Sequence, residues 1–269
     1  MDNFRLEEVN KALANDGFAI VPFASKNEIA ELSDYYRGLP EESLSGMQVT
    51  MFNPSYDYRK GVDEKIKEIC SAKAMAMMKG YRVLYTNFMI KQPGKEGNFP
   101  VHQDWTYVDE RFYLSYAFWI PLQSVNEENG ALHVIKKSHR FNTGLRGPFV
   151  HEPFQHLAEI IKDNYSQPVV LNAGEALIWD HRLIHFSGPN FSRVPRIAIT
   201  LIMVPDKADV FHCIAKQNEG FDLVEKFQVD TEFYLTYQIG KKTDELKLVE
   251  TIKQERKDFT ENYIENVLQ

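Results

Sequence analysis

Cysteine is scarce in this sequence: Cys70 and Cys213 are the only two among 269 residues, and they lie far apart in the chain. Two isolated cysteines provide neither a disulfide framework nor a cysteine-based zinc site, so we expect both to be buried free thiols in a reducing compartment. The N-terminus also lacks the basic segment and apolar run of a secretory signal. We therefore expect a cytoplasmic protein.

Long hydrophobic runs and an excess of positive charge are also missing. No stretch reaches the ~18 uninterrupted apolar residues of a membrane-spanning helix, so we expect no membrane span. The net charge of −7 argues against a nucleic-acid partner, which usually requires a basic surface. Aromatic residues, by contrast, make up 13% of the chain, enough for a large core or an aromatic pocket. We expect one domain over residues 1–269, a monomer or homodimer that acts on a small molecule.

The first 80 residues predict helices, one strand and a long loop. The predicted helices cover residues 4–15, 25–37 and 62–79, and the predicted strand covers residues 18–21. Ser25 followed by Glu28 is a capping-box pattern that marks the start of the second helix. Residues 38–60 show no clear periodicity, which indicates a long loop of the kind that often serves as a binding loop or lid.

From Tyr81 the pattern changes to short β-like segments separated by glycine, proline and asparagine turn signals. The predicted strands cover residues 82–91, 99–105, 113–122, 131–136, 169–171, 176–179 and 197–204. So many short strands favour a mainly β protein with flanking helices, whose core is a jelly roll or a similar double sheet.

Two further helices are predicted around this core, which we place at residues 81–205. An amphipathic segment near residues 153–164 predicts an inserted helix. After Pro205 we expect an extension over residues 206–269 made of a strand and a helix. The Lys- and Glu-rich stretch from Thr243 to Val267 predicts a solvated terminal helix.

The residues that indicate chemistry are histidines and an aspartate. His102 and Asp104 stand two apart, so on a strand both side chains leave the same face of the sheet. His185 adds a second imidazole. Two imidazoles and one carboxylate form the facial triad that binds Fe(II) and leaves positions open for oxygen and a co-substrate.

Arg196 lies on the apolar strand-like segment that follows His185. A buried arginine requires an anionic partner, and no acid in that segment provides one. The far carboxylate of 2-oxoglutarate, whose keto-acid end chelates iron, can supply that partner because a guanidinium binds a carboxylate with two parallel hydrogen bonds.

Taken together, these residues resemble the phytanoyl-CoA dioxygenase-like family of Fe(II)/2-oxoglutarate oxygenases. The resemblance covers roughly residues 82–205. It rests on several ordered motifs: Lys91-Gln92-Pro93-Gly94, His102-Gln103-Asp104, Trp119, Asn129-Gly130-Ala131-Leu132, Ser138-His139, Gly174-Glu175-Ala176, His185-Phe186-Ser187, Asn190 and Arg196.

The resemblance implies a double-stranded β-helix, the cupin-like form of the jelly roll, with the metal site at its mouth. It assigns Fe(II) to His102, Asp104 and His185, and it implies O2 as a further substrate. It places Arg196 and Ser187 at the distal carboxylate of 2-oxoglutarate, and Trp119 in the wall of the co-substrate pocket.

The resemblance leaves some positions open. Thr86 or Asn87 is expected to contact 2-oxoglutarate. His181, four residues before His185, is a rival metal ligand, but Ser187 and the spacing to Arg196 favour His185. The remaining histidines lack such context, and we expect structural or exposed roles for His133, His139, His151, His156 and His212.

The activity implied is oxidative decarboxylation of 2-oxoglutarate to succinate and CO2, coupled to hydroxylation of an unactivated C–H bond. Asp104 favours hydroxylation because related halogenases have a small residue at that position, which leaves room for chloride. Desaturation, cyclisation and epimerisation stay open. Two other hypotheses are a cupin-like metal-dependent isomerase or lyase that does not use 2-oxoglutarate, and a catalytically silent binding barrel.

The sequence does not identify the substrate, but some residues are candidates for contacting it. Aromatic side chains that follow the metal motif are candidates for the pocket wall: Trp105, Tyr107 and Phe112. Candidates for gripping a carboxylate or phosphate are Arg146, Arg182 and Arg193. The acidic pair Asp109-Glu110 is an alternative that would seat an amine.

Overall fold

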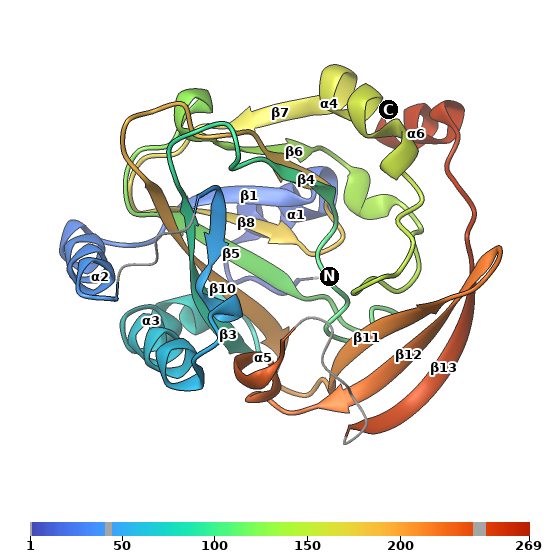
Figure 1. Ribbon diagram of the computed structural model, residues 1–269, viewed down its shortest axis with the longest axis horizontal. Helices are drawn as coiled ribbons and strands as arrows, with labels where there is room; N and C mark the ends of the chain where they lie inside the picture. Colours follow the sequence, from blue (N-terminus) through green and yellow to red (C-terminus); the bar gives the residue numbers. More distant parts are fainter. Residues whose placement is uncertain (1, 41–44, 239–245) are drawn as a thin grey trace.

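The computed structural model describes residues 2–40, 45–238 and 246–269. It contains two β-sheets that face each other across an apolar interior and a third, separate sheet formed by the C-terminal part of the chain (Figure 1). Helices cover the outer faces of the two facing sheets. All strand pairs within the named sheets are antiparallel.

The larger facing sheet has six strands in the order β1-β8-β5-β10-β3-β2. Their bounds are β1 Phe18–Pro22, β8 Glu175–Asp180, β5 Tyr116–Pro121, β10 Arg196–Pro205, β3 Tyr81–Lys91 and β2 Met47–Val49. The smaller facing sheet has the order β4-β9-β6-β7, with β4 Phe99–His102, β9 His185–Ser187, β6 Leu132–Ile135 and β7 Ser166–Val169. This pair of sheets forms the frame of the site.

Successive side chains of β10 point alternately to the two faces of the larger sheet. Ile199, Leu201 and Met203 pack against the helices, whereas Ala198 and Ile202 belong to the interior cluster between the sheets. Because side chains on a strand alternate with a period of two, the polar positions of β10 with the same parity also point into the interior.

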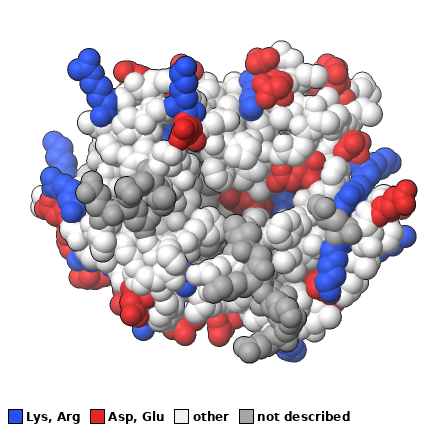
Figure 2. Space-filling view, viewed as in Figure 1, with Lys and Arg blue, Asp and Glu red and all other residues white. Residues whose placement is uncertain are grey.

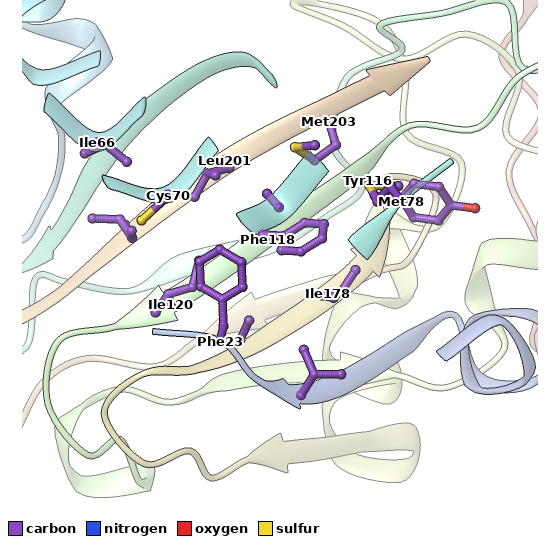
Figure 3. Packing of buried hydrophobic residues seen from close by; sticks show 14 of the residues in the cluster. Phe23, Ile66, Cys70, Met78, Tyr116, Phe118, Ile120, Ile178, Leu201 and Met203 are labelled. Atoms are coloured by element: carbon purple, nitrogen blue, oxygen red, sulfur yellow. The ribbon is translucent and has the colours of Figure 1, made fainter. Parts of the chain in front are cut away.

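Three helices cover the outer face of the larger sheet: α1 Glu7–Asp16, α2 Lys26–Arg37 and α3 Tyr56–Met77. Figure 3 shows Ile66 and Cys70 of α3 among the buried side chains of the sheet, such as Phe118 and Leu201. Full burial of each large apolar side chain contributes about 1.5–3 kcal/mol, so this layer holds the sheet rigidly. Both cysteines are buried free thiols, as expected, and burial raises the pKa of Cys70 to about 12.

The capping box predicted at Ser25 is present, with the Ser25 side chain accepting from the Glu28 amide and Glu28 accepting from the Ser25 amide. The prediction of one long loop over residues 38–60 is wrong in part. That segment contains β2, the short 3-10 helix η1 Thr50–Phe52 and the first turn of α3. The sequence signal missed there is Ser55, which caps α3 by accepting from the Tyr58 amide. Residues 41–44 of the predicted loop lie outside the described residues.

The smaller sheet is covered by α4 Ala158–Tyr165, which the sequence predicted as an inserted helix, and by α6 Glu261–Leu268. Ile161 of α4 and Ile264 of α6 pack with Val101, Ile184 and Phe186 in one buried cluster. Short 3-10 helices lie in the connections: η2 Glu127–Asn129, η3 Ser138–Arg140 and η4 Gln155–Leu157.

The C-terminal part forms the third sheet, β11 Val210–Gln217, β12 Phe221–Val229 and β13 Lys247–Glu255, with the short helix α5 Phe233–Thr236 before β13. The single helix predicted from Thr243 to Val267 is therefore wrong over β13. Lys and Glu favour helix, but β-branched Val249, Thr251 and Ile252 and pairing along β12 override that preference. Residues 243–245 of that prediction lie outside the described residues.

No helix within residues 2–40, 45–238 and 246–269 combines enough length and apolar character to cross a membrane.

Candidate active site

Three predicted ligand residues meet at one end of the space between the facing sheets. His102 ends β4 and pairs in register with His185, which begins β9. Asp104 lies beyond the end of β4, so the strand predicted over residues 99–105 is too long. The Asp104 amide donates to the His181 carbonyl at 3.0 Å, and this bond holds the aspartate in place. One ligand atom from each of His102, Asp104 and His185 lies within 4.8 Å of the other two.

Each of the two histidines has one ring nitrogen fixed by a backbone carbonyl. His102 Nδ1 lies 2.8 Å from the Pro100 carbonyl oxygen, and His185 Nδ1 lies 3.0 Å from that of Leu183. When Nδ1–H donates to these carbonyls, the lone pair of Nε2 is free to bind a metal. Burial, followed by the charge of His185, lowers the pKa of His102 to about 4, which keeps its imidazole in the neutral form that ligates metals.

The two carboxylate oxygens of Asp104 have different neighbours. Oδ1 lies 3.9 Å from Nε2 of His102 and 3.9 Å from Nε2 of His185. Oδ2 accepts a hydrogen bond from Trp179 Nε1 at 2.7 Å. The carboxylate is thus turned so that one oxygen faces the histidines while the other is held by the indole.

This donor set fits iron. Within the part of the chain that the structure describes, it is the one cluster of three His, Cys or acidic ligands close enough to hold a metal. Two imidazoles and one carboxylate on one side match the facial arrangement of non-haem Fe(II), with positions left for other ligands. His181 is not part of the cluster, and its Nδ1 is bonded to the Ser115 hydroxyl at 2.7 Å.

Two buried cations lie beside the cluster without an anionic partner among the described residues. Arg196 begins β10 and is 1% exposed, and its Nε and Nη1 have no hydrogen-bond partner there. Lys91 ends β3, pairs in register with Arg196, and is fully buried. Its Nζ donates to the Ser187 hydroxyl at 2.7 Å and to the Gly188 carbonyl.

The pKa values of Lys91 and Arg196 are both lowered, as expected for buried cations that have no anionic partner among the described residues. Burial, followed by the charge of Arg196, lowers the pKa of Lys91 to about 7, and burial lowers the pKa of Arg196 to about 9. Buried charges are normally paired, so this pair of cations requires an anionic ligand. The Arg196 guanidinium also lies over the Trp119 ring, 5.0 Å from its centroid.

Lys91 has no role predicted from the sequence, although it lies in the Lys91-Gln92-Pro93-Gly94 motif. Its position in the sequence does carry a signal. A lysine at the end of an apolar strand is expected to be buried and, like Arg196, to require an anionic partner. Gly130 makes room for it, since at φ +80° a Cβ on Gly130 would lie 2.6 Å from Lys91 Cδ. The glycine at position 130 is therefore required by the packing of Lys91 as well as by its left-handed backbone.

A row of polar side chains crosses the sheet next to the two cations. Thr200 of β10 pairs with Asn87 of β3 on one side and with Trp119 of β5 on the other. Thr200 Oγ1, Asn87 Oδ1 and Trp119 Nε1 are buried without a hydrogen-bond partner among the described residues. Buried polar atoms are rarely left unpaired, so this row fits a polar ligand in the pocket.

Thr86 and Asn87 are adjacent on β3, so their side chains point to opposite faces of the sheet. Asn87 lines the pocket together with Arg196 and Ser187. Thr86 points to the other face of β3, where its amide and hydroxyl contact Asp63 of α3 at 2.7 and 3.1 Å.

Other candidate residues fall into two groups. Trp105 and Tyr107 line the pocket. Phe112 does not, and it is 66% exposed. Asp109 pairs with Arg111 at 2.6 Å, so it is not poised for a ligand amine.

The five histidines for which the sequence predicted structural or exposed roles lie outside the ligand cluster. His139 and His212 are buried, His133 stacks on Phe186, and His151 and His156 lie near Asp258.

The charges on the surface are mixed. Lys and Arg alternate with Asp and Glu across the described residues of the face in Figure 2, and acidic side chains gather in a hollow near its centre.

Comparison with known proteins identifies a matching family. The family model Phytanoyl-CoA dioxygenase (PhyH) matches residues 16–198. Phytanoyl-CoA dioxygenase domain-containing protein 1 homolog of Dictyostelium discoideum is 29% identical over 123 residues, a match that covers 42% of this chain and 43% of that protein. This chain thus spans less than half the length of that curated relative.

Solved structures with a similar fold include the non-heme alpha ketoglutarate dependent epimerase SnoN from nogalamycin biosynthesis. It has a TM-score of 0.55 and 18% identity, and the match covers 93% of both chains. HygX from Streptomyces hygroscopicus, solved with nickel, 2-oxoglutarate and hygromycin B, has a TM-score of 0.52 and 12% identity over 75% of this chain and 88% of that one. These similarities confirm the predicted mainly β fold with a jelly-roll core and flanking helices.

Proposed function

The chain belongs to the phytanoyl-CoA dioxygenase family, and from this membership and the geometry of its site we propose that it is an Fe(II)/2-oxoglutarate-dependent dioxygenase that hydroxylates a small molecule. One observation carries the proposal: two buried cations, Arg196 and Lys91, have no anionic partner among the described residues and lie beside a cluster of two histidines and a carboxylate. A metal ion would bind the cluster of histidines and carboxylate, and a dicarboxylate would supply the anion that the two cations require.

The metal half consists of His102, Asp104 and His185. The carbonyls of Pro100 and Leu183 orient the imidazoles, and Trp179 orients the carboxylate. When bound there, Fe(II) and 2-oxoglutarate supply the oxidising chemistry, in which O2 converts 2-oxoglutarate to succinate and CO2 and one oxygen atom enters a C–H bond of the substrate.

The co-substrate half consists of Arg196, Lys91 and Ser187 with the neighbouring polar row. Arg196 offers Nε and Nη1, which have no partner among the described residues, to the distal carboxylate. Lys91 and Ser187, already bonded to each other, close the other side. Trp119 packs against the guanidinium and fixes its plane. These side chains neutralise, orient and shield the dicarboxylate from water.

Hydroxylation is the outcome that Asp104 favours, since its carboxylate takes the coordination position that a halide would need. The presence of an epimerase among the proteins of similar fold shows that this fold supports other outcomes. HygX, which was solved with hygromycin B, supports a small molecule as the substrate here.

The decisive experiment is spectroscopic. Purified protein under anaerobic conditions, given Fe(II) and then 2-oxoglutarate, should develop the weak visible charge-transfer band of the iron chelate. Asp104→Ala should show no band, and Arg196→Ala should need much more 2-oxoglutarate to reach it. A metal-dependent isomerase or lyase would bind Fe(II) without the band, and a silent barrel would bind neither.

A further inference from the structure

The mouth of the pocket is apolar. Most residues that line the pocket are buried, and the partly exposed ones mark its open side. Apart from the metal-ligand residues, the partly exposed lining residues that the structure describes are Met47, Val49, Phe52, Met89, Phe99 and Trp105. A molecule seated at this mouth removes their surface from water, which favours an apolar partner.

Two charged side chains line the pocket among the described residues, and the proposed function uses both of them. Asp104 faces the metal, and Arg196 faces the distal carboxylate of 2-oxoglutarate. A charged group on the substrate would therefore be buried without a counter-ion, which is strongly unfavourable.

The arginines that could have gripped an anionic substrate are engaged elsewhere. Arg146 pairs with Glu110, with Nη2 and Oε1 2.6 Å apart, and its Nε donates to the Asp104 carbonyl. Arg182 pairs with Asp180 at 2.5 Å. Arg193 is exposed and does not line the pocket. The expected arginine grip is thus not built at the site.

From these observations we infer that the substrate is a neutral, largely apolar small molecule, held by its hydrocarbon or aromatic skeleton. The inference rests on the proposed function, because it names what the same pocket takes beside 2-oxoglutarate. It sets aside a phosphate, carboxylate or ammonium group as the feature recognised.

The side chains at the mouth also bear on the shape of the substrate. Met47 and Met89 at the mouth, and the buried lining residue Met51, have flexible, polarisable thioethers that adapt to irregular apolar surfaces. Phe52, Phe99 and Trp105 offer rings for face or edge contacts. The structure thus assigns recognition to contact area, with little directional hydrogen bonding from the rim.

The test compares two fluorescent probes that share one skeleton and differ by one negative charge. N-phenyl-naphthylamine is neutral, and anilinonaphthalene sulfonate is the corresponding anion. Each is titrated against anaerobic protein saturated with Fe(II) and 2-oxoglutarate, so that the sulfonate has no access to Arg196. We expect the neutral probe to bind at least about tenfold more tightly, because the anion would be buried unpaired.

A pair of matched variants locates the binding. Phe52, which is 43% exposed, lines the pocket, whereas Phe112, which is 66% exposed, does not. Phe52→Ala should weaken binding of the neutral probe several-fold, and Phe112→Ala should leave it unchanged. Equal or tighter binding of the sulfonate, no binding of the neutral probe, or equal effects of the two variants would overturn the inference.

The visible band of the iron chelate distinguishes a failure of the proposed function from a failure of the inferred substrate class. If the band forms but the probes behave in one of those ways, the proposed function stands and the substrate class is wrong. If the band never forms, the proposed function fails and the substrate class fails with it.

Discussion

Replacement of Lys91 by methionine should move fold stability and co-substrate affinity in opposite directions. Methionine keeps the length of the side chain and removes the buried positive charge. In the empty protein that charge lies next to Arg196 without an anion among the described residues, so its removal relieves an unfavourable burial.

The pKa of Lys91 gives the size of the effect. It is lowered from 10.5 to about 7 in the folded protein. One pKa unit corresponds to about 1.4 kcal/mol, so at pH 7 the buried cation costs the fold on the order of 4 kcal/mol. The lost hydrogen bonds to Ser187 and Gly188 offset about 1 kcal/mol each. The net expectation is a more stable empty protein by roughly 2 kcal/mol, or about 4–8 °C in Tm.

The affinity for 2-oxoglutarate should change the other way. A hydrogen bond from a charged donor to a carboxylate contributes about 1.5–3 kcal/mol, so Lys91→Met should raise the Kd roughly 10- to 150-fold. Thermal unfolding without ligand and anaerobic titration of the visible band measure the two quantities. Lys95→Met, at an exposed position between β3 and β4, is the control and should change neither.

The same residue predicts a pH dependence. Between pH 7 and 10.5 the unfolded chain holds a proton on Lys91 that the empty folded protein has lost, so stability of the empty protein should rise with pH in that window. The bound carboxylate favours the cation, so affinity for 2-oxoglutarate should fall as pH rises above about 7. Between pH 7 and about 9 both trends should vanish in Lys91→Met; above about pH 9 the lowered pKa of Arg196 adds a dependence of its own, which that variant retains. A variant that unfolds at lower temperature and binds 2-oxoglutarate as well as the wild type would refute this reasoning.

Three further substitutions test the remaining roles. Arg196→Ala should raise the 2-oxoglutarate requirement by about 30-fold or more, since it removes one partner of a buried charge pair; an unchanged KM for 2-oxoglutarate would contradict that role. Asp104→Ala should abolish tight Fe(II) binding and succinate release, and turnover that survives would exclude Asp104 as a ligand. Trp179→Phe keeps the ring but frees Asp104 Oδ2, so Fe(II) affinity in anaerobic titration should fall about 10- to 100-fold. An Fe(II) affinity equal to that of the wild type would show that the indole does not position the carboxylate.

The parts of the structure that local sequence predicts well are those with a short-range physical cause. The capping box at Ser25 lies within four residues, and the apolar alternation of β10 needs only its own strand. The metal residues were also accessible, because His102 and Asp104 are neighbours in the chain and His185 is followed closely by Ser187 and Arg196.

The features that the sequence does not predict depend on pairing between distant segments. Asn87 rather than Thr86 faces the pocket because of the parity that β3 takes against β10. Lys91 becomes a partner of Arg196 through that same register. The strand β13 exists because β12 offers it an edge, and its Lys and Glu residues do not reveal this. Asp104 takes its place from a backbone bond to His181, far along the chain.

The position of β2 has a consequence for how this protein can diverge. His185, Ser187, Lys91 and Arg196 lie on inner strands of the two sheets, where a substitution disturbs a neighbouring strand on each side, whereas His102 ends the edge strand β4. Part of the pocket mouth, Met47, Val49 and Phe52, comes from an edge strand bonded only to β3 and from the 3-10 turn after it. Selection can remodel that margin residue by residue while the reaction is preserved. If the proposed function holds, substitutions at this margin can change which substrate fits while the metal and co-substrate residues keep their places.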